Sequence, residues 1–69
     1  MTQEDVKNNI GSKVYITGDG DLAMQRNLRQ LILNKTELTI ARLTQSGEAY
    51  LMDSDGRYYS APTRNVVLK

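Results

Sequence analysis

The sequence contains no cysteine and no histidine. These two absences exclude disulfides, thiolate and imidazole metal sites, and the serine-histidine and cysteine-histidine pairs of nucleophilic enzymes. Tryptophan and phenylalanine are also missing, so all four aromatic residues are tyrosines. The core must then be built from aliphatic side chains, which leaves the tyrosines free to lie at the surface.

Long apolar runs and a strong charge of one sign are missing as well. No apolar stretch approaches the roughly 20 residues of a membrane span, and the first residues are polar, unlike a signal peptide. We therefore expect a cytoplasmic protein with no membrane contact. The net charge is +1, from nine basic and eight acidic residues, which is far from the basic excess typical of non-specific nucleic-acid binding.

What is present indicates a small globular protein. With 69 residues, of which 39% are hydrophobic, the chain is expected to fold as a single domain over residues 1–69. Residues 1–11 are predicted to form a capped helix. Thr2 and Asp5 have the spacing of a capping box, and Met1 and Val6 have that of a hydrophobic staple. Gly11 is expected to end this helix.

Two interpretations compete for residues 22–33, a helix and a strand. The helix is favoured because Asp21 can cap it and because its apolar residues share one face at the helical period. These apolar residues are Met24, Leu28, Leu31 and Ile32. The opposite face carries Arg26 and Arg29.

Short segments of alternating apolar and polar residues predict strands with one buried face. They are residues 12–17, 36–43, 48–53, 57–61 and 66–68. A turn at Gly47 separates the second strand from the third. Residues 53–56, with the sequence Asp-Ser-Asp-Gly, favour a type I turn closed by a bulge. Pro62 is expected to end the fourth strand, and a tight turn over residues 63–65 leads to the last one.

This order of elements resembles an SH3-like barrel over residues 12–68. The matching features are the strand Val14-Tyr15-Ile16, the long segment 18–35, the hairpins at Gly47 and Gly56, and the closing stretch 61–68. The resemblance implies an α+β fold: a small SH3-like antiparallel β-barrel with a short N-terminal helix and a helix, at about residues 22–33, inserted after the first strand. In its small size and design, the domain resembles small bacterial or bacteriophage accessory proteins. Proline-rich ligands of signalling SH3 domains are not expected here, because tryptophan is absent.

No motif for catalysis or for metal binding survives inspection. The Asp-Ser-Asp-Gly stretch would need carboxylates at Leu51 and Pro62 to complete a calcium loop. Gly18-Asp19-Gly20 is not followed by the residues of a phosphate-binding loop. The carboxylates flank turns rather than apolar pockets. We therefore expect no catalytic residue, no metal, no cofactor and no enzymatic activity.

The first functional hypothesis is a protein-interaction module that acts as an adaptor, inhibitor or regulatory subunit. Tyrosine and arginine dominate the energetics of protein interfaces. Tyr58 and Tyr59 must point to opposite faces of their strand, and Tyr15 is expected to face outward because its two neighbours face inward. The predicted partner-binding residues are Tyr15, Arg26, Arg29, Tyr58 and Tyr59.

Two alternatives stay open. A nucleic acid could bind through phosphate contacts with the basic residues while tyrosines stack on its bases. The residues predicted for that role are Arg26, Arg29, Lys35 and Arg42. A homo-oligomer could also form through strand edges, for which residues 66–68 are the candidate.

Overall fold

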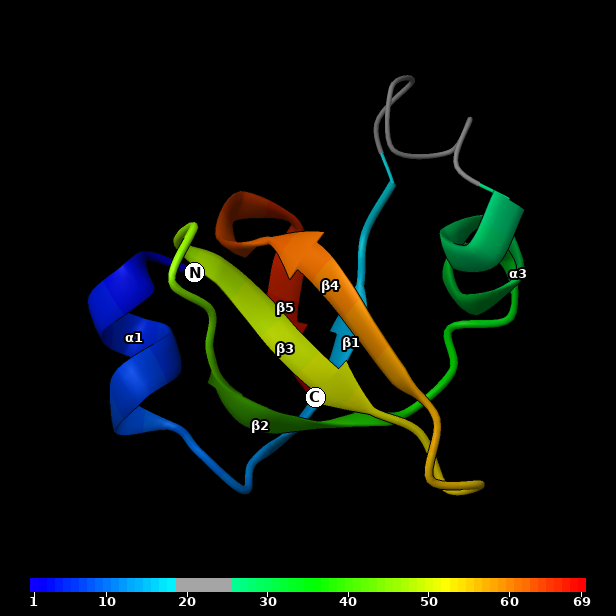
Figure 1. Cartoon of the computed structure of the whole chain (residues 1–69). Helices are drawn as coiled ribbons and strands as arrows, with labels where there is room; N and C mark the ends of the chain where they lie inside the picture. The colour runs from blue at the N-terminus through cyan, green and yellow to red at the C-terminus, as the bar shows by residue number, and fades with distance from the viewer. Residues whose placement is uncertain (19–25) are drawn as a thin grey trace.

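The computed structural model describes residues 1–18 and 26–69, which form an α+β fold (Figure 1). Five strands make up one antiparallel sheet. They are β1 (Lys13–Ile16), β2 (Leu38–Leu43), β3 (Glu48–Met52), β4 (Tyr58–Pro62) and β5 (Val66–Leu68). The helices of the described residues are α1 (Gln3–Asn8) and α3 (Arg26–Leu33), and a 3-10 turn, η1 (Thr63–Asn65), precedes β5.

The strands are ordered β4-β3-β2-β1-β5, and each neighbouring pair is antiparallel. This arrangement confirms the predicted α+β class and the antiparallel sheet. β4 and β5 are the two edges of the sheet. Within residues 1–18 and 26–69 no backbone ladder joins these edges, so closure of the sheet into a barrel is not seen there.

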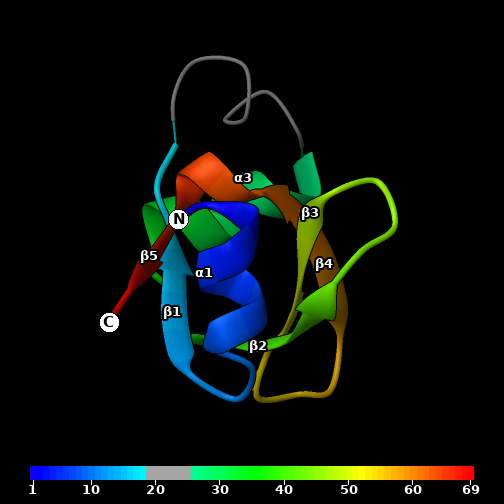
Figure 2. The same ribbon diagram turned by 90° about the vertical axis from the view of Figure 1, so that its left-hand side faces the viewer.

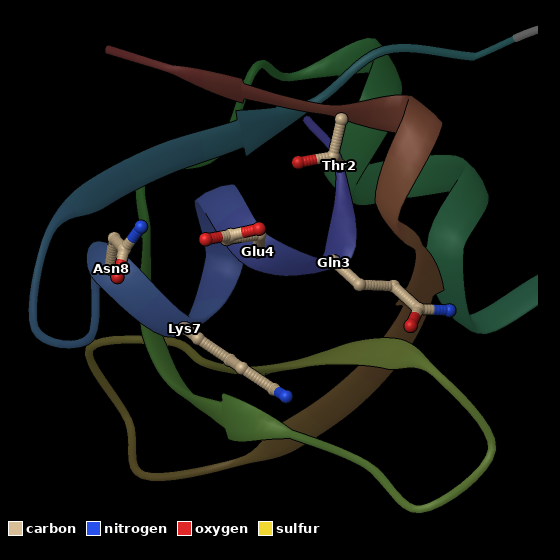
Figure 3. A pocket seen from close by; sticks show the side chains of 5 residues that line it. All are labelled: Thr2, Gln3, Glu4, Lys7 and Asn8. Carbon is tan, nitrogen blue, oxygen red and sulfur yellow. The ribbon is translucent and has the colours of Figure 1, made fainter.

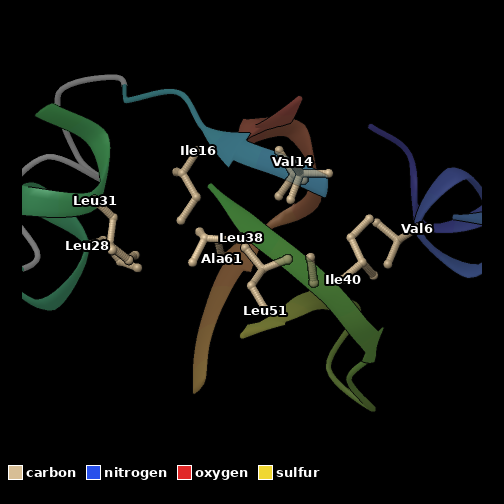
Figure 4. Packing of buried hydrophobic residues seen from close by; sticks show 11 residues of the cluster. Val6, Val14, Ile16, Leu28, Leu31, Leu38, Ile40, Leu51 and Ala61 are labelled. Atoms are coloured by element: carbon tan, nitrogen blue, oxygen red, sulfur yellow. The ribbon is translucent and has the colours of Figure 1, made fainter. Parts of the chain in front are cut away.

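The core is aliphatic, as the composition predicts. Its buried residues form one cluster, to which the sheet contributes most of the side chains. Figure 4 shows Val6 of α1 entering this cluster from one side and Leu28 and Leu31 of α3 entering from the other. α1 contacts β2 and β3, and α3 contacts β1. The two helices lie at opposite ends of the same core (Figures 1 and 2).

The capping box at the start of α1 forms as predicted. Thr2 Oγ1 accepts a hydrogen bond from the Asp5 amide at 3.1 Å, and Asp5 Oδ2 accepts one from the Thr2 amide at 3.1 Å. The second bond is the main cause of a lowered pKa of the Asp5 carboxyl. Val6 is fully buried, but the expected extension of the helix to residue 10 is wrong. The helix ends at Asn8, and Ile10 is 52% exposed because Gly11 already donates to the Ile40 carbonyl at 2.8 Å.

α3 confirms the helical interpretation over Arg26–Leu33 and excludes the strand there. Leu28 and Leu31 are buried, as the helical period predicts. The first part of the predicted helix, with Met24 and the proposed cap Asp21, lies outside the described residues.

α3 ends in a Schellman motif. The Thr36 amide donates to the Leu31 carbonyl at 3.0 Å, and the Lys35 amide donates to the Ile32 carbonyl at 3.3 Å. Lys35 adopts φ +47°, the left-handed conformation that usually belongs to glycine at this position. A Cβ atom in that conformation costs roughly 1 kcal/mol.

Replacing Lys35 with glycine is therefore expected to stabilise the protein by about 0.5–1 kcal/mol. For a domain of this size the melting temperature should rise by about 2–8 °C. Thermal unfolding followed by circular dichroism measures the change. Asn34→Gly, one residue earlier at a position without positive φ, is the matched control and should not stabilise. An unchanged or lower melting temperature for Lys35→Gly would contradict this account of the helix end.

Asn65 is the buried polar residue of the described chain, at 5% exposure. Its Nδ2 donates to the Thr17 carbonyl at 3.0 Å, and its own carbonyl accepts from the Thr17 amide at 2.7 Å. These bonds tie the end of β1 to the end of η1. The orientation of β5 against β1 therefore depends on this residue.

Candidate functional site

The outer face of β2, β3 and β4 carries three side chains that form one stack, which we call the tyrosine-arginine patch: Arg42, Tyr50 and Tyr58. The rings of Tyr50 and Tyr58 lie 4.9 Å apart between centroids and within 8° of parallel. The Arg42 Cζ atom lies 4.7 Å from the centroid of the Tyr50 ring. Since β3 runs between β2 and β4, Tyr50 lies between the other two members of the patch.

A β-bulge brings Arg42 to this face. Regular alternation along β2 would place Arg42 on the same side as Leu38 and Ile40, which are buried. The bulge between Ile40 and Arg42 adds one residue and reverses the alternation. Arg42 thereby pairs with Tyr50 and is exposed.

The patch is preformed and accessible. Tyr58 is 51% exposed, and one face of its ring is covered by Tyr50. Arg42 forms no ion pair within residues 1–18 and 26–69, so the Tyr50 ring is its observed contact. Cation-π and aromatic pairs each contribute about 0.5–1.5 kcal/mol, which favours this arrangement of the three side chains.

Asp53 stabilises the turn that joins β3 to β4, beside the patch. Its Oδ1 atom accepts from the amides of Asp55 and Arg57, both at 2.9 Å, and its Oδ2 atom accepts from the Tyr59 hydroxyl at 3.0 Å. The Arg57 amide is the largest cause of a lowered pKa of the Asp53 carboxyl. Gly56 adopts φ +84° and donates to the Asp53 carbonyl at 3.2 Å, in the turn predicted for residues 53–56.

Tyr59 has a supporting place in the structure. It is half-buried and packs against the core on the face of β4 opposite to Tyr58. Partial burial, and then the bond to Asp53, raise the pKa of its hydroxyl. Tyr59 thus links the turn of the hairpin to the core.

The other predicted residues lie away from the patch. Tyr15 is half-buried on β1, where it pairs with Val67. Tyr15 and Lys35 line the same depression of about 260 Å³. Glu37 and Lys69, which form an ion pair, also line this depression. Lys35 and Tyr15, predicted for different roles, are therefore neighbours.

Arg26 and Arg29 are exposed on α3. In the described part of the chain neither forms a hydrogen bond or an ion pair. They belong to an element that contacts β1, whereas Arg42 lies on β2 next to β3. The four residues predicted for phosphate contact are thus divided among α3, the turn after it and β2.

A surface depression of about 790 Å³ lies along α1 (Figure 3). The side chains that line it are exposed. They are Thr2, Gln3, Glu4, Lys7 and Asn8. Because it is open and holds one acidic and one basic side chain, this depression offers no enclosed site for chemistry.

Metal ligands and membrane spans were also sought. Residues 1–18 and 26–69 contain no group of three acidic, histidine or cysteine side chains that could hold a metal ion. None of the helices in the described part of the chain has the length and apolar character that crossing a bilayer requires.

Comparison of the chain with protein-family models, with curated proteins and with solved structures found no match. The tyrosine-arginine patch is therefore identified by its geometry alone. Sequence reasoning singled out Tyr58 and Arg42 but missed Tyr50, the residue that joins them. The signal was available, because alternation along residues 48–53 places Tyr50 on the face opposite to Ala49 and Leu51.

Proposed function

We propose that this chain is a non-catalytic binding module of SH3-like fold that holds another protein on the tyrosine-arginine patch. The observation that carries the proposal is a preformed stack of one arginine and two tyrosines, with the outermost ring half exposed. A folded protein gains little from displaying such a ring to water. Arginine and tyrosine are also the side chains enriched at the energetic centres of protein interfaces.

The SH3-like part of the proposal is supported by topology. The order of elements along the chain matches the one on which the resemblance rests: a first strand, a long excursion between β1 and β2, hairpins at Gly47 and Gly56, and a short turn before the last strand. The bend that the bulge introduces in β2 is the feature such small barrels need to curve their sheet. Fold alone does not specify function, so the patch carries the functional argument.

A protein partner is favoured over a nucleic acid on electrostatic grounds. The net charge is +1, and the hairpin beside the patch contains the carboxylates of Asp53 and Asp55. Phosphate binding needs several free cations arranged along a backbone. Here Arg42 contacts a tyrosine ring, and Arg26 and Arg29 lie on another element.

The proposal predicts a matched pair of results from peptide selection. Random peptides of about ten residues, displayed on phage, are selected on the folded protein, and the most enriched one is synthesised. Its dissociation constant, measured by fluorescence anisotropy, should rise at least about tenfold in Tyr58→Ala and in Arg42→Ala, the size expected of residues at an interface centre. Arg29→Ala, the same substitution on α3, should leave it within about twofold.

Binding of single-stranded DNA tests the nucleic-acid alternative. A labelled oligothymidine is titrated with the protein at low and at physiological salt. The proposal predicts weak binding with little salt dependence. Tight binding that falls steeply with salt and is weakened by Arg26→Ala and Arg29→Ala would replace the proposed protein partner with a nucleic acid.

A further inference from the structure

The exposed edge of β4 has a hydrogen-bonding pattern that the structure fixes. The Asp53 amide donates to the Arg57 carbonyl at 2.9 Å, so residues 53 and 57 are a hydrogen-bonded pair at the end of the hairpin. Hydrogen-bonded and non-bonded pairs alternate along an antiparallel ladder. With the observed register, the next bonded pairs are Leu51 with Tyr59 and Ala49 with Ala61.

It follows that Tyr58 and Ser60 turn their amide and carbonyl groups away from β3. Both residues are exposed, and no backbone hydrogen bond within residues 1–18 and 26–69 reaches either group outside the β3-β4 ladder. Pro62 has no amide hydrogen, so the available edge ends there. The free groups are therefore two donors and two acceptors spaced two residues apart, which is the pattern that an extended chain complements.

The opposite edge of the sheet, formed by β5, has fewer free backbone groups than the edge of β4. The Val66 carbonyl accepts from the amino group of Met1 at 3.0 Å, and the Val66 amide donates to the Thr63 carbonyl. The backbone amide and carbonyl groups of Val67 point toward β1, with which they form the ladder. Along residues 66–68, the predicted edge for self-association, only Leu68 keeps outward backbone groups.

We propose that the edge of β4 binds an extended segment of another protein, which adds to the sheet as a sixth strand beside Tyr58 and Ser60. This inference rests on the proposed function and specifies how the partner is held. Outward side chains of the added strand would lie next to the tyrosine-arginine patch. Because Tyr50 covers one face of the Tyr58 ring, the other face can accept an aromatic side chain of the peptide.

A second copy of this chain fits the edge less well. If two β4 edges paired antiparallel about Tyr59, Tyr58 of each copy would lie opposite Ser60 of the other. A serine covers little of a tyrosine ring. An aromatic residue of a peptide covers more of the ring than a serine does. The occupant we propose is therefore an extended peptide with an aromatic residue at an outward position.

The test compares Ser60→Pro with Ser60→Ala. Both remove the hydroxyl, but only proline removes the outward amide and places a ring where the added strand must lie. Neither substitution removes a bond to β3, because Ser60 and Tyr50 form a non-bonded pair. With the phage-selected peptide, Ser60→Pro should bind at least about tenfold more weakly than Ser60→Ala.

Hydrogen exchange on the unaltered protein provides a second measurement in case Ser60→Pro does not fold. Saturation with the peptide should slow exchange of the Tyr58 and Ser60 amides, while those of Tyr59 and Ala61 are already protected by the β3-β4 ladder. Unchanged exchange at Tyr58 and Ser60 in the saturated protein overturns strand addition.

The outcomes separate the two proposals. If Tyr58→Ala and Arg42→Ala weaken the peptide but Ser60→Pro binds like Ser60→Ala, the patch stands and strand addition is wrong. If no peptide is enriched, the proposed function itself fails, and strand addition with it. If sedimentation shows a concentration-dependent dimer that Ser60→Pro abolishes, the edge belongs to a second copy and not to a foreign peptide.

Discussion

Leu51→Ala is expected to remove most of the free energy of unfolding of this domain. Leu51 is fully buried on β3, where it pairs with Ile40 on one side and Tyr59 on the other. Truncation of a leucine in such a position costs about 2–5 kcal/mol through lost burial and a residual cavity. The core of a domain this short rarely supplies more than about 3–5 kcal/mol, so one such substitution removes most of its stability.

Urea unfolding followed by circular dichroism measures this loss. The matched control is Leu33→Ala on α3, where the side chain is 65% exposed. That substitution should change the free energy of unfolding by no more than about 0.5 kcal/mol. A loss below about 1 kcal/mol for Leu51→Ala would mean that β3 is not at the centre of the core.

The second large effect is expected for Asn65→Asp, and it depends on pH. The substitution removes the donor to the Thr17 carbonyl and introduces a carboxyl in a buried place. Burial opposes its ionisation, so the pKa of this carboxyl should be higher in the folded than in the unfolded state. The variant should then be most stable below the unfolded pKa of about 3.9 and lose stability as the pH rises, with about 3 kcal/mol or more lost at neutral pH.

Asn65→Ala separates the charge from the lost hydrogen bond. It should cost about 1–3 kcal/mol, because the Thr17 carbonyl loses a partner, and the cost should not vary with pH. Unfolding curves at acidic and neutral pH for both variants make the comparison. Equal losses for Asn65→Asp at the two pH values would show that residue 65 is not sealed from water.

Much of the fold could be predicted because it depends on local rules. The capping box at Thr2 and the glycine turn at residues 53–56 depend only on neighbouring residues, and both are present. Alternation identified the strands, and the helical period identified α3 over Arg26–Leu33. These signals are strong because each element must bury one face.

One departure from prediction comes from a tertiary contact. α1 stops at Asn8 because Gly11 pairs with Ile40, a residue far along the chain. The residues near the end of α1 do not reveal this pairing. The left-handed conformation of Lys35 after α3 is instead set locally, by the Schellman bonds to Leu31 and Ile32.

The candidate site could be predicted only in part, because the position of one member depends on strand pairing. The stack of Tyr50 on Tyr58 follows from the register that the turn at Gly56 sets, so it was within reach of sequence reasoning. The position of Arg42 could not be predicted from the sequence. In an unbroken strand its side chain would face the core, and only the bulge after Ile40 places it on the outer face of the sheet. Assigning Tyr59 to the supporting hairpin required the bond to Asp53.

The central claim is that the tyrosine-arginine patch receives a protein partner. Amide chemical-shift mapping by NMR, with labelled protein titrated with the phage-selected peptide, tests it most directly. The account predicts that the large shifts fall on β3 and β4 around Tyr50 and Tyr58 and on β2 at Arg42. Shifts confined to α3 around Arg26 and Arg29, or to the depression beside Tyr15, would contradict it.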